Sequence, residues 1–368
     1  MPTPLTIALC NETDGPGGAE VLLVQLAAEL RDRGHRVIPV LPTPAVGWIQ
    51  ERFREHGFES EAVQLLGSSM ASCVSQLRSI FRRHEVGVVH SHEFTMAVFG
   101  AAAARSLGLR HVITMHGNQW MTDSWKRRTA LRVAFRMTHE VTAVSGDTRD
   151  HLVETLGRPA ERVRVIVNGV PVRQGDGDAV REEFSLAPET LLLLAVGGLH
   201  PRKGHDVLLR ALSGADGEKP WKLIIAGQGP ERARLQELAE SEGIAERVLL
   251  VGQREDIPDL QAAADLFVMP SLWEGLPLAM LEAMLAATPV VASRISGIPE
   301  AIRDGEEGLL VPPGDVSALR EALSRMMADD DLRRRLGAAG EERALRDFTI
   351  RRMAEDYERL YTGVAAEV

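Results

Sequence analysis

Apolar residues along the chain fall into short continuous runs that alternate with longer stretches, in which apolar positions recur every third or fourth residue. The short runs are typical of buried strands and the longer stretches of amphipathic helices. Strands without a polar face that alternate with helices indicate parallel sheets covered on both sides. The predicted strands are 5–10, 37–41, 86–90, 112–115, 141–144 and 163–167 in the first half, and 191–196, 223–226, 248–251, 266–269 and 290–292 in the second.

A polar, glycine-rich segment at residues 168–178 interrupts this alternation and is typical of a linker. A chain of 368 residues is long enough for two α/β domains with complete cores. We therefore predict an α/β protein with two Rossmann-like domains, residues 1–170 and 171–347. Residues 348–368 begin with a predicted helix for which Thr349 is a suitable cap.

Composition excludes several classes of protein. A net charge of -10 argues against general nucleic-acid binding. No apolar run approaches the ~20 residues of a membrane span, and the N-terminus has no basic leader. Cys10 and Cys73 are far apart and match no metal-site spacing, as expected for reduced thiols of a cytoplasmic protein. Histidines and carboxylates do not cluster with metal spacing either, so we predict neither a metal nor a cofactor.

Two carboxylates flank a turn and a helix start in the second half. Glu274 follows a predicted strand, Gly275 and Pro277 mark the turn, and Glu282 lies in the apolar helix that follows. A helix rises ~1.5 Å per residue, so eight positions separate the carboxylates by ~12 Å, farther apart than the ~5 Å pair of a retaining glycosidase. This distance suits an extended ligand with hydroxyls at both ends, such as a sugar nucleotide. Free N–H groups of the first helical turn would face its phosphates.

Adjacent cations occupy the loop after the first strand of the second half. Arg202 and Lys203 precede Gly204, between a strand and a helix. Such a pair neutralises a diphosphate, although an arbitrary pair of cations is more often a solvated surface feature. The position at the carboxyl end of a parallel strand favours the binding role. Gly227 ends the next strand, where it either approaches a ligand or only forms a turn.

Glycines also follow the first strand of the chain. Gly17 and Gly18 let the backbone approach a phosphate, but they equally allow a tight turn without a ligand. The spacing of Gly15, Gly17 and Gly18 is not that of a dinucleotide-binding dehydrogenase.

Three histidines end predicted strands in the first half. His116, beside Gly117, is a candidate ligand contact, whereas His90 and His92 are better explained as ordinary structural histidines. The basic segment Trp125–Arg136 suits either an anionic membrane surface or a core helix with a solvated face, and packing in the core is favoured.

In their order and spacing these motifs resemble family 4 of the retaining, nucleotide-sugar-dependent glycosyltransferases. The resemblance covers nearly the whole chain. It rests on Gly17–Glu20, Arg33–Val37, Asn168–Val170, Lys203–Gly204 and the pair Glu274 and Glu282. It departs from the family pattern at Gly198, where many members carry an arginine, and at Pro171, where aspartate is usual.

The resemblance implies the GT-B architecture, in which two Rossmann-like domains face each other and the last helix crosses back to the N-terminal, acceptor-side domain. The C-terminal domain would bind the donor. In that case Glu274 holds the donor sugar, Glu282 the ribose, and Arg202 with Lys203 the diphosphate. Backbone at Gly17, Gly18, Gly275 and Leu276 would assist, and His116 would lie near the sugar. The candidate catalytic residues are then Glu274, His116 and Lys203, with Gly227 among the donor contacts.

The resemblance implies metal-independent transfer with retained anomeric configuration. The donor is expected to be a nucleoside-diphosphate sugar, with uridine diphosphate favoured, and the acceptor a glycan, a lipid-linked saccharide or a small molecule. Polysaccharide biosynthesis is one setting, in the cytoplasm or at the inner face of the membrane. Two alternatives stay open: a nucleotide-sugar-binding module without catalysis, and another two-Rossmann enzyme such as an epimerase.

Overall fold

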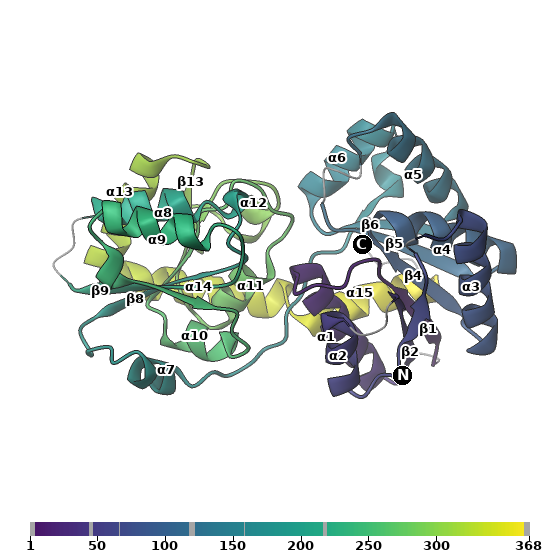
Figure 1. Cartoon of the computed structure of the whole chain (residues 1–368), viewed down its shortest axis with the longest axis horizontal. Helices are drawn as coiled ribbons and strands as arrows, with labels where there is room; N and C mark the ends of the chain where they lie inside the picture. Colours follow the sequence, from purple (N-terminus) through teal and green to yellow (C-terminus); the bar gives the residue numbers. More distant parts are fainter. Residues whose placement is uncertain are drawn as a thin grey trace. The chain divides into compact units, whose positions relative to one another are not determined.

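The computed structural model describes residues 4–43, 47–65, 67–117, 122–157, 159–215 and 219–363. The chain forms two compact units, Met1–Gly169 with Ile350–Val368, and Val170–Thr349. Each unit is built on one sheet of parallel strands with helices packed against it (Figure 1). The predicted fold class, two Rossmann-like α/β sheets, is confirmed.

The sheet of unit 1 has seven strands in the order β3-β2-β1-β4-β5-β6-β7. The strands are β1 (Thr6–Cys10), β2 (Arg36–Pro42), β3 (Glu61–Val63), β4 (Val88–His92), β5 (Arg110–Met115), β6 (Glu140–Ala143) and β7 (Arg164–Val165). The helices are α1 (Gly18–Asp32), α2 (Trp48–Glu55), α3 (Met70–Arg83), α4 (Glu93–Leu107), α5 (Trp125–Met137), α6 (Gly146–Leu156), the 3-10 turn η2 (Ala160–Arg162) and α15 (Ile350–Thr362).

The sheet of unit 2 has six strands in the order β10-β9-β8-β11-β12-β13. The strands are β8 (Leu191–Val196), β9 (Trp221–Ala226), β10 (Val248–Gly252), β11 (Leu266–Met269), β12 (Val290–Ser293) and β13 (Gly308–Val311). The helices are α7 (Gly177–Glu183), α8 (His205–Ser213), α9 (Arg232–Ser241), α10 (Ile257–Ala263), α11 (Leu278–Leu285), α12 (Ile298–Ala301), α13 (Val316–Ala328) and α14 (Asp330–Asp347), with 3-10 turns η3 (Pro201–Lys203) and η4 (Ala245–Arg247).

The strand order reverses once in each sheet, between β1 and β4 in unit 1 and between β8 and β11 in unit 2. At such a switch point the loops leave the carboxyl ends of the two central strands in opposite directions and open a crevice for a ligand. In unit 2 these loops carry Lys203 and Glu274. In unit 1 they carry Gly17 and the start of α4.

The sheets differ from the predictions in two missed strands and in several strand bounds, of which β4 matters most. The edge strands β3 and β13 were not predicted, because each is short and pairs with a neighbour on one side only. Strand β4 runs from Val88 to His92, two residues later than predicted, so His92 lies inside the strand rather than after it.

The segment that joins the units is held closely against α10. A Cβ atom on Gly175 would lie 2.1 Å from the Pro258 carbonyl oxygen, and one on Gly177 would lie 2.7 Å from that of Ala262. Its glycines are therefore required for close backbone contact with a helix. This packing differs from that of a freely moving linker.

The last helix, α15, belongs to unit 1, where it lies beside α1 (Figure 1). The Arg33 guanidinium donates to both carboxylate oxygens of Glu358, at 2.8 and 2.6 Å. His35 contacts the same carboxylate at 2.8 Å through Nε2 and accepts a hydrogen bond from the Leu5 N–H through Nδ1. Burial alone would raise the pKa of Glu358, but the hydrogen bonds from Arg33 and His35 lower it below its usual range.

None of the helices in the described part of the chain combines the length and the apolar character that a bilayer span requires.

Candidate functional site

The loops after β8 and β11 are joined backbone to backbone in unit 2. Gly204 has a φ of 65°, and a Cβ atom there would lie 2.1 Å from the Pro270 carbonyl oxygen, so both conformation and space require glycine. The Leu272 N–H donates to the Arg202 carbonyl at 2.7 Å. These contacts bring together two stretches of chain that are about 70 residues apart in sequence.

This junction places Lys203 and Glu274 in direct contact. Lys203 Nζ lies 2.5 Å from Glu274 Oε1, and the Ser271 hydroxyl donates to the same oxygen at 2.8 Å. An Arg202 guanidinium nitrogen lies 3.7 Å from the other oxygen. The Glu274 side chain is only 8% exposed, so its charge is balanced mainly by these cations. The predicted diphosphate and sugar contacts thus lie in one cluster.

Two residues of this cluster were not predicted from the sequence, Ser271 and His205. His205 begins α8 and is buried directly after the cationic loop. Burial, and then the charge of Lys203, lower the pKa of His205 to about 4. The imidazole is therefore neutral at neutral pH. The positive charge of this loop comes from Lys203 and Arg202.

The segment after Glu274 turns through Gly275 and Leu276 before α11 begins at Leu278. Pro277 is the N-cap residue, and no side-chain hydrogen bond caps this end of the helix. Its first N–H groups are therefore available to an anion. Because only the last part of the interval from Glu274 to Glu282 is helical, the separation of ~12 Å, which assumed a continuous helix, does not apply.

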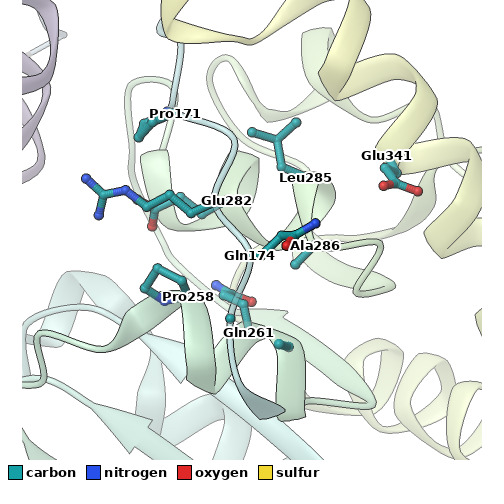
Figure 2. A pocket seen from close by; sticks show the side chains of 11 residues that line it. Pro171, Gln174, Pro258, Gln261, Glu282, Leu285, Ala286 and Glu341 are labelled. Atoms are coloured by element: carbon teal, nitrogen blue, oxygen red, sulfur yellow. The ribbon is translucent and has the colours of Figure 1, made fainter.

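Glu282 lines a cavity of about 320 Å³ in unit 2, together with residues of the joining segment, α10 and α14 (Figure 2). Burial raises the pKa of Glu282, and the nearby charge of Arg173 counteracts only part of this effect. Gln261 is 1% exposed, and its Oε1 has no hydrogen-bond partner among the described residues. The cavity therefore presents oxygen acceptors to a ligand that carries hydroxyl or amino groups.

Gly227 lies where the loop after β9 meets the loop after β8. A Cβ atom on Gly227 would lie 1.9 Å from the Gly197 carbonyl oxygen, and its N–H donates to the Gly252 carbonyl at 2.7 Å. Packing alone explains this glycine. A donor contact at Gly227 stays a prediction.

In unit 1 the loop after β1 packs against a carboxylate of the first turn of α1. The Glu20 carboxylate accepts a hydrogen bond from the Thr13 hydroxyl. It also lies against Gly17, where an added Cβ atom would be 2.2 Å from Glu20 Oε2. Gly17 therefore lies against the end of the Glu20 side chain, which would have to shift to admit a Cβ atom. Gly18 is the first residue of α1. Phosphate contacts at Gly17 and Gly18 stay predictions.

The three predicted histidines lie close together in unit 1. His90 is buried, and its ring nitrogens contact Tyr361 and Thr114 at 2.7 Å each, which agrees with a structural role. His92 Nδ1 lies 2.9 Å from His116 Nε2. Burial lowers the pKa of both residues, that of His116 to about 4. The site in unit 1 is therefore built from a pair of neutral imidazoles.

The described residues contain no cluster of three or more histidine, cysteine, aspartate or glutamate side chains that could hold a metal ion.

Comparison with known proteins assigns the chain to a family. Residues 176–343 match the family model for glycosyl transferases group 1, and residues 16–174 match that for glycosyltransferase family 4. The GDP-mannose-dependent alpha-(1-6)-phosphatidylinositol monomannoside mannosyltransferase of Mycolicibacterium smegmatis is 33% identical over 281 residues, which cover 69% of this chain and 72% of the relative. The chain belongs to the group 1, family 4 glycosyltransferases.

Two other relatives differ in how much of their length this glycosyltransferase matches. The D-inositol 3-phosphate glycosyltransferase 2 of Catenulispora acidiphila is 30% identical, over 85% of this chain and 84% of the relative. An exopolysaccharide phosphotransferase of Streptomyces coelicolor is 38% identical, but only over 53% of this chain, and the match spans 20% of that relative's length. The similarity to that relative therefore concerns one part of a larger protein.

Solved structures confirm the fold of the glycosyltransferase. Anabaena HepE in complex with UDP superimposes with a TM-score of 0.86 and 23% identity, over 98% of this chain and all of HepE. Lys203, Arg202, Glu274 and Ser271 thus belong to a family whose members transfer sugars. The switch point of unit 2 is the candidate donor site of this glycosyltransferase.

Proposed function

We propose that this glycosyltransferase transfers a hexose from a nucleoside-diphosphate sugar to a hydroxyl group, with retained anomeric configuration and without a metal ion. The observation that carries the proposal is the contact of Lys203 with the buried Glu274 at the switch point of unit 2. A sugar diphosphate needs a cation for its phosphates next to an acceptor for its sugar hydroxyls. These two groups provide both.

The reaction forms a bond between the acceptor oxygen and the anomeric carbon and breaks the bond from that carbon to the diphosphate. Negative charge develops on the leaving diphosphate, where Lys203 and Arg202 stabilise it. The acceptor hydroxyl loses its proton to the leaving diphosphate, and attack on the leaving-group face retains the configuration. Glu274 accepts hydrogen bonds from the sugar and orients it. The cations provide the charge stabilisation that a metal ion supplies in other transferases.

Glu282 is proposed to hold the ribose of the donor. The raised pKa of its buried carboxyl reflects the cost of keeping the carboxylate without donors. A ribose offers two neighbouring hydroxyls that would supply them. The cavity of about 320 Å³ beside Glu282 is within the usual size range of small-molecule sites. In Figure 2, Glu282 lies between Pro171 of the joining segment and Pro258 of α10.

Uridine diphosphate is the nucleotide we propose for the donor. Support comes from the fold neighbour HepE, which was solved with UDP and with UDP-glucose. One relative is named for GDP-mannose, so the choice needs a direct test. A glycan, a lipid-linked saccharide and a small molecule are the acceptor classes that fit the family.

A thermal-shift screen with UDP, GDP, ADP and their sugar conjugates in EDTA tests the proposal. A ligand that binds only the folded protein raises the melting temperature by mass action. We expect a shift with UDP and its sugars, followed by release of UDP when the sugar is transferred or hydrolysed. A shift only with GDP would change the base. A shift that requires magnesium would overturn metal independence, and binding without UDP release would favour a module without catalysis.

We also propose that α5 contacts an anionic membrane surface. Leu131, Ala134 and Phe135 are buried in unit 1, whereas Trp125 is 66% and Val133 47% exposed. Exposed cations lie on the same helix as the exposed tryptophan, a combination typical of interfacial helices. Sedimentation with vesicles of phosphatidylserine, compared with phosphatidylcholine alone, tests this contact. Binding that is unaffected by Trp125→Ser would contradict it.

A further inference from the structure

The switch point of unit 1 contains a strained turn between β4 and α4. His92 ends the strand and Glu93 begins the helix, and they are only 2% and 4% exposed. Glu93 has a φ of 64°, which a residue with a side chain adopts only where the surroundings enforce it. Strain of this kind concentrates at functional positions, so the side chain that the turn orients needs an explanation.

The Glu12 carboxylate fixes the start of α4. It accepts hydrogen bonds from the Thr95 N–H and, at 3.3 Å, from the Met96 N–H. Glu12 comes from the loop after β1, so both central strands of the sheet determine where α4 begins. His92 comes one residue before α4, so its backbone adjoins the helix start that these contacts fix.

His92 is bonded on one side only. Its Nδ1 lies 2.9 Å from His116 Nε2, and its Nε2 is buried without a hydrogen-bond partner among the described residues. The neighbouring His90 ring cannot serve Nε2, because both His90 nitrogens are already bonded to Tyr361 and Thr114. His116 is less buried than His92 and forms no further hydrogen bond with described residues.

One proton must lie between the two bonded nitrogens. If His116 donated it, His92 would carry its own proton on Nε2, and a buried N–H would have no acceptor. If His92 donates through Nδ1–H, its Nε2 carries no proton, and only an acceptor lone pair is left without a partner. Buried N–H groups without a partner are the rarer case in proteins, so the second arrangement is favoured. The lowered pKa values of both rings are consistent with two neutral imidazoles, one of which donates its N–H to the other.

We propose that His92 is a positioning residue, whose Nδ1–H donates to Nε2 of His116 and fixes the proton of His116 on Nδ1. His116 then presents an N–H donor on its less buried side. It is not a base. Its ligand atom is an oxygen acceptor, which, resting on the proposed function, is a hydroxyl oxygen of the donor sugar.

The proton positions can be measured by NMR on the full chain with isotope-labelled histidine. Nitrogen shifts distinguish the two tautomers, and the loss of a signal in His116→Asn identifies His116. We expect the His116 proton on Nδ1 in the native protein and in His92→Asn, whose amide nitrogen occupies the place of Nδ1. In His92→Gln, which places the amide at Nε2 instead, we expect the proton of His116 to redistribute to Nε2.

A matched control is His111→Gln. His111 is equally buried, but its ring bonds Thr138 and Ser91 and does not contact His116. We expect this variant to lower stability without changing the His116 signal. A native His116 that is protonated on Nε2, or one that is unchanged in His92→Gln, would overturn the proposal.

Ligand affinity provides the second readout. We expect His92→Gln to weaken the binding of UDP-glucose about 5-fold, as for the loss of one hydrogen bond, and to leave the affinity for UDP unchanged. In a His116→Ala background the same substitution should have no further effect. Equal losses for UDP and UDP-glucose would contradict a sugar contact. If neither ligand binds the native protein, the proposed donor is wrong, and the NMR result alone still decides the role of His92.

Discussion

Lys203 and Glu274 should have opposite effects on the affinity for UDP, although they form one ion pair. Lys203→Met removes the cation that faces the diphosphate. A charge-assisted hydrogen bond contributes about 2 kcal/mol, so we expect roughly 30-fold weaker UDP binding. Glu274→Gln keeps the hydrogen-bond acceptor for Ser271 but removes a negative charge next to the diphosphate site. UDP should therefore bind Glu274→Gln as tightly as the native protein, or more tightly.

Glu274→Gln should lower the rate of sugar transfer even though it retains the affinity for UDP. Its carboxylate accepts hydrogen bonds from the sugar in our proposal, and single preorganised polar groups typically contribute about 100-fold to a rate. We therefore expect Glu274→Gln to lower UDP release from UDP-glucose by about 100-fold while UDP affinity is retained. Isothermal titration with UDP and a coupled assay of UDP release measure the two quantities separately.

The control for the lysine is Lys219→Met. Lys219 also forms an ion pair in unit 2, with Asp330 at 2.6 Å, but both side chains are 43% exposed. Lys219 precedes β9 at the amino ends of the parallel strands, whereas the loop after β8 lies at their carboxyl ends. The UDP affinity of Lys219→Met should equal that of the native protein. The assigned roles are wrong if Lys203→Met binds UDP with an affinity within 2-fold of the native protein. They are also wrong if Lys203→Met and Glu274→Gln weaken UDP binding equally.

Three further outcomes can be checked. The lowered pKa of Glu358 means that its contribution to stability is present above its unfolded pKa of about 4.5 and is lost as pH falls through the folded value; denaturant unfolding between pH 3 and pH 7 should show this loss, and Glu358→Gln should remove most of it. Gly204→Ala should destabilise unit 2 by about 2 kcal/mol or more, because the new Cβ meets the Pro270 carbonyl at a φ that favours glycine, and native stability in calorimetry would contradict this. Gly17→Ala should change the melting temperature little, because the new Cβ meets only the flexible end of the Glu20 side chain at an extended φ; if Gly17 serves a phosphate, UDP affinity should fall nonetheless, and unchanged affinity would contradict that role.

The two-sheet fold could be predicted from the sequence because the features that mark each strand lie within the strand and its flanking residues. Each buried parallel strand is a short apolar run between turn residues, as at Leu191–Val196 of β8, where nearly every side chain is buried. Length and flanking residues suffice to recognise such runs. The edge strands β3 and β13 were missed because pairing with a neighbour, rather than their own composition, makes them strands.

The position of the candidate donor site was also predicted from the sequence. Lys203 and Glu274 each follow a predicted strand, and the ends of parallel strands meet at one edge of a sheet. Direct contact between them was not predictable. It depends on the approach of Gly204 to Pro270 and on the hydrogen bond from Leu272 to Arg202, which join loops from distant parts of the chain.

Tertiary structure also changed the interpretation of single residues. At Gly17 the structure adds a neighbour that the sequence did not indicate, the Glu20 carboxylate, and a phosphate contact there stays a prediction. His92 was judged an ordinary structural histidine, yet it contacts His116 and leaves one buried nitrogen unpaired. Sequence patterns report which side chains are apolar and where the chain turns, because these properties are local. Which polar atoms meet, and which lack a partner, is decided only when the sheet brings separate loops together.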